Sequence, residues 1–174
     1  MYRQVWVDDS HTGLQRIFWR ENPTDPLQIL ELKTVTYGTA GAPFLATRAL
    51  KQLARDENKR SPVASRIIEE DFYVDDVMTG SDSITEAIQI RFQLSELLKL
   101  GGFPIHKWCA SDESILDTIP EKDKEKLMSF DQSKEAQFMK ALGMLWDPKK
   151  DTLSFHYNKQ SNIKDATKRT ARYS

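Results

Sequence analysis

Two adjacent carboxylates, Asp75 and Asp76, lie between two short apolar runs of the sequence. The flanking residues 72–74 and 77–78 are typical of β-strands, and Gly80 follows in a stretch rich in turn residues. Two like charges side by side repel each other, so they are stable only where water or a cation screens them. The pattern therefore predicts a β-hairpin with both carboxylates exposed at its turn.

The segment after this hairpin has the features of an amphipathic helix. Ser83 and Glu86 have the spacing of a capping box, and Gly101 and Gly102 provide a stop signal. Apolar residues recur every three or four positions between these signals, which predicts one buried face. We expect that face to contain Ile84, Ala87, Ile88, Leu94, Leu97 and Leu98.

The other expected elements alternate between strands and helices. Period-two patterns and β-forming residues predict strands, whereas apolar residues at helical spacing after Pro43 and after Ser61-Pro62 predict two helices. We expect strands over 1–7, 14–19, 27–37 and 103–108, helices over 43–56 and 62–68, a surface loop with short helical turns over 112–135, and β-segments over 139–146 and 152–157 joined by a turn at 147–151. This order predicts an α+β fold, a split βαβ (ferredoxin-like) sheet with helices on one face.

Composition limits the functions that such a fold can have. The 174 residues include 25 Lys and Arg against 26 Asp and Glu, so no overall positive field attracts nucleic acid. A single cysteine, Cys109, excludes an internal disulfide and a cysteine-based zinc site, and we expect it to be a half-buried thiol. The apolar runs are too short to span a membrane, so we expect a soluble intracellular protein without membrane partners.

The carboxylate pair allows two interpretations. Paired aspartates are common in solvated turns, where they need no ligand. Alternatively, Asp75 and Asp76 provide the oxygen ligands that Mg²⁺ prefers, with Mn²⁺ as a substitute, and a second ion nearby would give a two-metal phosphoryl-transfer site.

The sequence around this pair resembles a known catalytic motif. Tyr73-Val74-Asp75-Asp76, followed by Gly80, is similar to the Tyr-x-Asp-Asp box of reverse transcriptases. Further blocks follow the same order over nearly the whole chain, and together they resemble the Pao/BEL class of long-terminal-repeat retrotransposons. The resemblance implies a polymerase palm over 1–157, with a partial fingers segment, and a basic polar tail over 158–174 that leads into a connecting region.

The resemblance implies roles for residues in the first half of the chain. Asp75 and Asp76 would be catalytic metal ligands, and Tyr73 and Val74 would lie against the primer terminus. Tyr2 would occupy the position that screens the sugar of the incoming nucleotide. In this family a catalytic aspartate precedes the position of Tyr2 in the same motif. That aspartate would fall just before Met1, so we expect a palm shortened at its N-terminus.

Further blocks imply further contacts. Tyr37 and Gly38 would bind the nucleotide, and Pro43 would lie near the template at the start of a helix. Tyr37 replaces the glutamine found in retroviral enzymes. Lys107 would be the general acid for the departing pyrophosphate, although a lysine at a strand end is more often only solvated. A primer-grip-like hairpin would contain Gly143, Met144, Leu145 and Trp146.

The function implied is that of an RNA-directed DNA polymerase, a nucleotidyltransferase that extends a primer on an RNA or DNA template with deoxynucleotides. Its expected partners are template, primer, nucleotides and the remainder of a retrotransposon polyprotein, in the cytoplasm or in retrotransposon particles. Because one aspartate is expected to lie outside the chain, activity of this chain alone is expected to be weak or absent. Two alternatives stay open, namely a catalytically dead palm that binds nucleic acid or protein, and a palm-like nucleotide cyclase.

Overall fold

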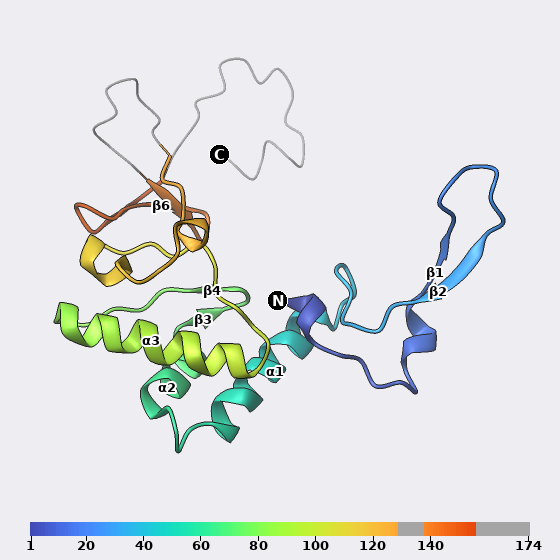
Figure 1. The fold of residues 1–174 in the computed structure, drawn as a ribbon, viewed down its shortest axis with the longest axis horizontal. Helices are drawn as coiled ribbons and strands as arrows, with labels where there is room; N and C mark the ends of the chain where they lie inside the picture. The colour runs from blue at the N-terminus through green and yellow to red at the C-terminus, as the bar shows by residue number, and fades with distance from the viewer. Residues whose placement is uncertain (129–137, 156–174) are drawn as a thin grey trace, which may run out of the picture. The chain divides into compact units, whose positions relative to one another are not determined.

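The computed structural model describes residues 1–128 and 138–155, and the chain divides into two compact units, Met1–Lys126 and Leu127–Ser174 (Figure 1). The described residues form an α+β structure with α-helices and small antiparallel sheets, as expected. None of the described helices has the length and apolar character needed to cross a membrane.

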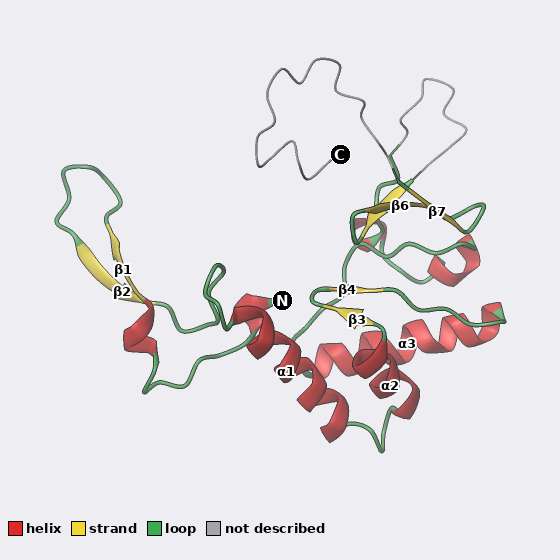
Figure 2. Ribbon diagram, turned by 180° about the vertical axis from the view of Figure 1, so that it is seen from behind, coloured by secondary structure: helices red, strands yellow, loops and turns green. Residues whose placement is uncertain are grey.

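Three α-helices form the core of the first unit. They are α1 (Ala42–Asp56), α2 (Pro62–Glu70) and α3 (Ile84–Leu100), and Figure 2 shows them packed together. Each helix buries one face, as its apolar spacing predicts. The buried core cluster contains Leu50, Ala54, Ala64, Ile67, Ile68, Ile90, Leu94, Leu97 and Leu98.

The helix boundaries agree closely with those expected from the sequence. Pro43 lies in the first turn of α1 and Pro62 in the first turn of α2, where a missing backbone N–H costs no hydrogen bond. The Ser83 hydroxyl accepts a hydrogen bond from the backbone N–H of Glu86 at 3.2 Å, so the predicted cap of α3 is confirmed. Gly101 ends α3, and a Cβ built on it would lie 2.4 Å from Leu53 Cδ2, so any other residue would force the Leu53 side chain to move.

The buried face of α3 is confirmed at Leu94, Leu97 and Leu98, but it differs from the expectation in the first half of the helix. Ile84 is 47 % exposed at the helix start, whereas Ile90 and Arg91 are buried. Arg91 Nη1 donates a hydrogen bond to Thr118 Oγ1 at 2.5 Å. A charged side chain was not expected in the core, but the Ser111–Pro120 region provides this partner, and burial of an arginine is tolerable only with such a contact.

The expected strand over residues 1–7 is wrong. A 3-10 helix, η1 (Tyr2–Gln4), forms there because the Gln4 and Val5 N–H groups bond back to Met1 and Tyr2 carbonyls at 3.0 Å. Extended backbone begins only after it, where Val5 and Val7 pair with Val35 and Lys33.

The next two strands are shorter than expected. A 3-10 helix, η2 (Thr12–Gln15), precedes β1 (Arg16–Trp19), which pairs antiparallel with β2 (Gln28–Glu31). Residues 32–37 carry only an isolated bridge between Thr34 and Trp6. All eight residues of this two-stranded ribbon are exposed, so it contributes little to the core.

The expected strand over residues 103–108 is also wrong. The described chain has only a bridge between Trp108 and Lys124 there. Pro104 removes a backbone donor, and Lys107 has φ +60°, so neither residue suits a regular ladder. The predicted loop with helical turns is confirmed as far as Met128, with η3 (Glu113–Leu116) and η4 (Glu121–Asp123).

The second unit contains a three-stranded antiparallel sheet of β5 (Met139–Ala141), β6 (Met144–Asp147) and β7 (Thr152–Ser154). The expected single segment over 139–146 is split because Leu142 and Gly143 both have positive φ, the conformation of a two-residue hairpin turn. The expected turn after β6 is confirmed, and the Asp147 carboxylate accepts hydrogen bonds from the backbone of Lys149 and Lys150. Tyr157 and the tail over 158–174 lie outside the described residues.

The three small sheets do not join within the described residues. Two of the strands expected for a split βαβ sheet, over 1–7 and 103–108, are replaced by a 3-10 helix and by irregular backbone. The α+β class is therefore confirmed, whereas the polymerase palm stays a prediction.

Packing of α3 can be tested with two leucines that differ in burial. Leu97 is fully buried and Leu100 is 53 % exposed on the same helix. We expect Leu97→Ala to lower the free energy of unfolding by about 2–5 kcal/mol because it leaves a cavity. Leu100→Ala is the control and should change it by about 0.5 kcal/mol. Urea titration followed by circular dichroism measures both, and equal losses would contradict the assigned core.

Cys109 provides a test of burial in the irregular region. The thiol is half-buried, and loss of hydration, with a smaller contribution from Glu125, raises its pKa. At pH 8 a smaller fraction of the Cys109 side chain is therefore thiolate in the native protein than in the unfolded chain. Iodoacetamide should react more slowly with the native protein, and the rate of this reaction should keep rising as the pH is raised further. Reaction at the same rate before and after unfolding in urea would contradict this environment.

Candidate functional site

The predicted carboxylate hairpin forms, with β3 (Phe72–Tyr73) antiparallel to β4 (Asp76–Val77). Phe72 pairs with Val77, and Tyr73 pairs with Asp76, which leaves Val74 and Asp75 as the two-residue connection. Val74 has φ +58°, the left-handed sign that short hairpin turns require and that a β-branched residue rarely adopts. The two aspartates thus occupy different positions, Asp75 in the turn and Asp76 at the first residue of a strand.

Both carboxylates are exposed, as expected. In the described part of the chain, no hydrogen bond or ion pair engages either of them. They are therefore free to accept an external ligand, and carboxylate oxygens fit a hard cation such as Mg²⁺. No group of three or more potential metal-binding side chains is found among residues 1–128 and 138–155. Water or phosphate oxygens would have to complete the coordination shell, as is usual for Mg²⁺.

The helical core holds this hairpin in place. Phe72 and Val77, the paired residues at its base, both pack against the buried core cluster. β3 begins two residues after α2, and Figure 2 shows the hairpin beside α2 and α3. Apolar side chains thus fix the base of the hairpin, whereas Tyr73, Asp75 and Asp76 remain exposed at its end.

The structure brings together two of the residues predicted to contact the nucleotide. The rings of Tyr2 and Tyr37 make an edge-to-face contact with centroids 5.0 Å apart and an interplanar angle of 74°. Tyr2 is half-buried, and Tyr37 is 59 % exposed. Met1, next to Tyr2, packs against the same core cluster as Phe72 and Val77. The first unit therefore attaches the tyrosine pair and the carboxylate hairpin to one core.

Open space surrounds the other predicted nucleotide residue. Gly38 has φ +83°, and a Cβ built on it would meet no atom within 4 Å. The chain then turns through a hydrogen bond from the Ala42 N–H to the Thr39 carbonyl at 3.1 Å, and α1 begins. Pro43 is exposed in the first turn of this helix. A helix start without a side-chain cap, next to a glycine, can accept a ligand close to the backbone.

Lys107 is exposed on irregular backbone, not at the end of a strand. Its neighbour Ile105 packs against the core cluster, whereas His106 pairs with Asp123 at 2.7 Å. No contact among the described residues links Lys107 with Asp75 or Asp76, so its role as a general acid stays a prediction.

The primer-grip residues lie in the second unit. Gly143 is exposed at the turn between β5 and β6, with φ +82°. Leu145 is buried within the sheet, and Met144 and Trp146 are half-buried, with Trp146 Nε1 donating to Asp151 at 2.9 Å. Only the turn is freely accessible, and the other three side chains serve the packing of this sheet.

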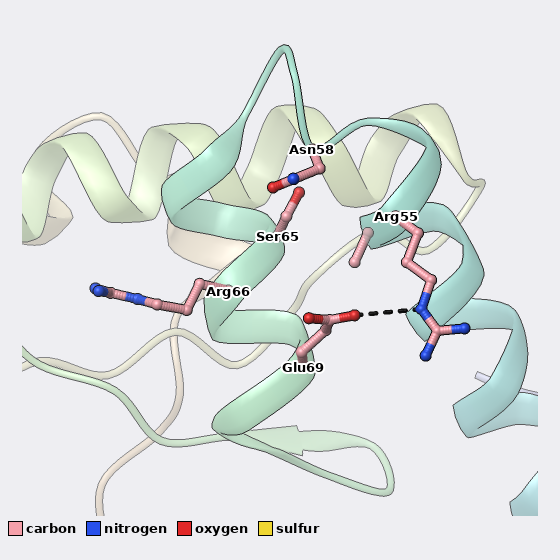
Figure 3. A pocket seen from close by; sticks show the side chains of 6 residues that line it. Arg55, Asn58, Ser65, Arg66 and Glu69 are labelled. Atoms are coloured by element: carbon pink, nitrogen blue, oxygen red, sulfur yellow. Dashed lines mark hydrogen bonds and ion pairs between the residues drawn. The ribbon is translucent and has the colours of Figure 1, made fainter.

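Sequence reasoning missed a pocket of about 220 Å³ between α1 and α2 (Figure 3). It is lined by Ala54, Arg55, Asn58, Ser65, Arg66 and Glu69. The i,i+4 spacing of Ser65 with Glu69 was the only available signal, because it places two polar side chains on the same side of α2.

Comparison with family models, with curated proteins and with solved structures finds no match to this chain.

The strained turn can be tested by replacing Val74. Val74→Gly removes the Cβ that makes positive φ costly, whereas Val74→Ala keeps it. We expect the glycine variant to unfold with a free energy about 1 kcal/mol higher than the alanine variant, in spite of the greater entropy of glycine in the unfolded chain. Thermal unfolding of the two proteins measures this difference. A glycine variant less stable than the alanine variant would contradict the turn geometry.

Proposed function

We propose that this chain is the palm part of an RNA-directed DNA polymerase, in which Asp75 and Asp76 bind the catalytic metal. The observation that carries the proposal is the hairpin itself, which presents two exposed, unpaired carboxylates on a base fixed by Phe72 and Val77. This arrangement combines a rigid support with accessible oxygen ligands, which a phosphoryl-transfer site requires.

The tyrosine contact supports the same proposal. Tyr2 and Tyr37 come from two separate sequence blocks, and both resemble positions that contact the incoming nucleotide. Their rings touch in the structure, next to the open backbone at Gly38 and the uncapped start of α1. In this proposal the aromatic pair bounds the sugar and base, and the helix start faces the phosphates.

The roles of the residues follow from these positions. Mg²⁺ or Mn²⁺ held by Asp75 and Asp76 would neutralise charge on the phosphates and make the primer hydroxyl more acidic. Tyr73, exposed beside the carboxylates and paired with Asp76, contacts the primer end. Val74, in the turn, would lie against the primer terminus, and Gly143 would contact the primer backbone.

Primer extension tests this proposal. The full chain is incubated with Mg²⁺ or Mn²⁺, deoxythymidine triphosphate and an oligo-dT primer on poly-A, together with Asp75→Asn and Asp82→Asn variants. Asp82 is exposed near the hairpin, so its variant makes the same change of charge outside the site. We expect weak incorporation by the parent chain, and we expect Asp75→Asn to abolish it, because that variant removes charge stabilisation of the transition state. The Asp82→Asn variant should be as active as the parent chain.

A direct measurement of metal binding separates the proposal from its alternative. Mn²⁺ bound to the hairpin is detected by electron paramagnetic resonance, and Asp75→Asn should abolish it. Template–primer binding without Mn²⁺ binding or extension would overturn the polymerase proposal in favour of a catalytically dead palm that binds nucleic acid. Cyclic product from GTP alone would favour a nucleotide cyclase.

A further inference from the structure

A buried arginine of α3 lacks an acidic partner. Arg91 is only 8 % exposed, and its Nη1 donates a hydrogen bond to the Thr118 hydroxyl oxygen at 2.5 Å. Its Nε is enclosed without a hydrogen-bond partner, and no carboxylate pairs with the guanidinium in the part of the chain that the structure describes. A neutral hydroxyl offsets little of the cost of burying a positive charge, so this guanidinium is suited to an added negative charge.

The hydroxyl that contacts Arg91 is accessible. Thr118 is exposed in the turn between η3 and η4, and η3 packs against α3. Arg91 Nη2 makes no hydrogen bond with the described residues and is not enclosed as Nε is, so it reaches the surface. The two terminal nitrogens of a guanidinium form a fork that matches two phosphate oxygens. A phosphate on Thr118 Oγ1 would therefore lie within reach of both nitrogens.

The sequence around Thr118 suits a protein kinase. Asp117 directly precedes Thr118, Glu121 follows it three positions later, and both are exposed. Glu121 contacts Lys124 at 3.1 Å, but such an exposed ion pair is weak and can open. Negative charge on either side of the hydroxyl complements a kinase with a basic substrate cleft. The exposed irregular backbone up to Pro120 can enter such a cleft.

Another exposed hydroxyl in the same region has the opposite surroundings. Ser114 lies in η3, and its Oγ donates a hydrogen bond to the Asp112 carboxylate at 2.5 Å. Phosphate on Ser114 would face a negative charge, whereas phosphate on Thr118 would face the positive charge of Arg91. The contact with Arg91 thus distinguishes Thr118 from its neighbour.

We propose that Thr118 is a phosphorylation site and that Arg91 binds the phosphate. A protein kinase transfers the γ-phosphoryl group of ATP to Thr118 Oγ1. The new O–P bond forms as the bond to ADP breaks, and the hydroxyl proton passes to a base of the kinase. The phosphate carries a charge of about −1.5 to −2 at pH 7 and accepts hydrogen bonds from Arg91 Nη1 and Nη2. Phosphorylation thereby fastens the turn after η3 to α3.

Thermal unfolding of the full chain tests the charge pair. Thr118→Glu adds a carboxylate, Thr118→Gln is the matched neutral control, and both are made with Arg91 present and together with Arg91→Met. With Arg91 present, we expect the glutamate variant to have a Tm about 3 °C above that of the glutamine variant, because a partly buried charge pair forms. Together with Arg91→Met, the two Tm values should agree within about 1 °C. Circular dichroism checks that each variant is folded.

Phosphorylation itself provides the second measurement. The parent chain, Thr118→Ala and Ser114→Ala are incubated with ATP and a protein kinase that prefers acidic residues around its target, and mass spectrometry locates the phosphate. We expect phosphate on Thr118 of the parent chain and of Ser114→Ala, and its loss in Thr118→Ala.

Each other outcome overturns the proposal. Phosphate on Ser114 in place of Thr118, or on neither residue, would exclude the site. An equal Tm difference between the glutamate and glutamine variants with and without Arg91→Met would exclude the role of Arg91. None of these measurements involves Asp75 or Asp76, so their outcome is independent of polymerase activity.

Discussion

The packing of α3 against α1 and α2 is the contact on which the rest of the first unit depends. Leu94, Leu97 and Leu98 bury almost all of their surface in it, and full burial of such side chains contributes about 1.5–3 kcal/mol each. The hairpin β3–β4 has only two residues in each strand, and an isolated hairpin of that size is not stable in water. The helices therefore determine where the two carboxylates lie. The strand pairing determines only that Asp75 is in the turn and Asp76 in β4.

The candidate sites differ in how they are supported. The carboxylates Asp75 and Asp76 are exposed and unpaired on a fixed base, an arrangement suited to a ligand that arrives with its own charge. In the α1–α2 pocket, by contrast, Ser65 is buried, whereas Arg55 and Glu69 form an exposed ion pair. The hairpin and the pocket both belong to the first unit, and the same helical core supports both.

Local signals made the helices and turns predictable from the sequence. Pro43, Ser83 and Gly101 mark helix ends through local chemistry, and the two polar residues Asp75 and Asp76 between apolar runs indicate the hairpin. Regular strands over 1–7 and 103–108 were mispredicted because strand formation depends on a partner elsewhere in the chain, and only the single bridges Trp6–Thr34 and Trp108–Lys124 form there. Local patterns did not reveal the contact between the Tyr2 and Tyr37 rings or the pocket at Ser65, because both depend on tertiary packing.

The hydrogen bond between Arg91 and Thr118 has a consequence for how this sequence can evolve. A buried guanidinium that loses its partner is left with an unsatisfied donor, so a change at Thr118 alone is harmful while Arg91 remains. Once an apolar residue replaces Arg91, the hydroxyl of Thr118 is no longer needed for that purpose. Substitutions at these two positions are therefore coupled, and the order in which they occur decides whether the intermediate protein is stable. In related sequences the two positions should covary, although 27 residues separate them along the chain.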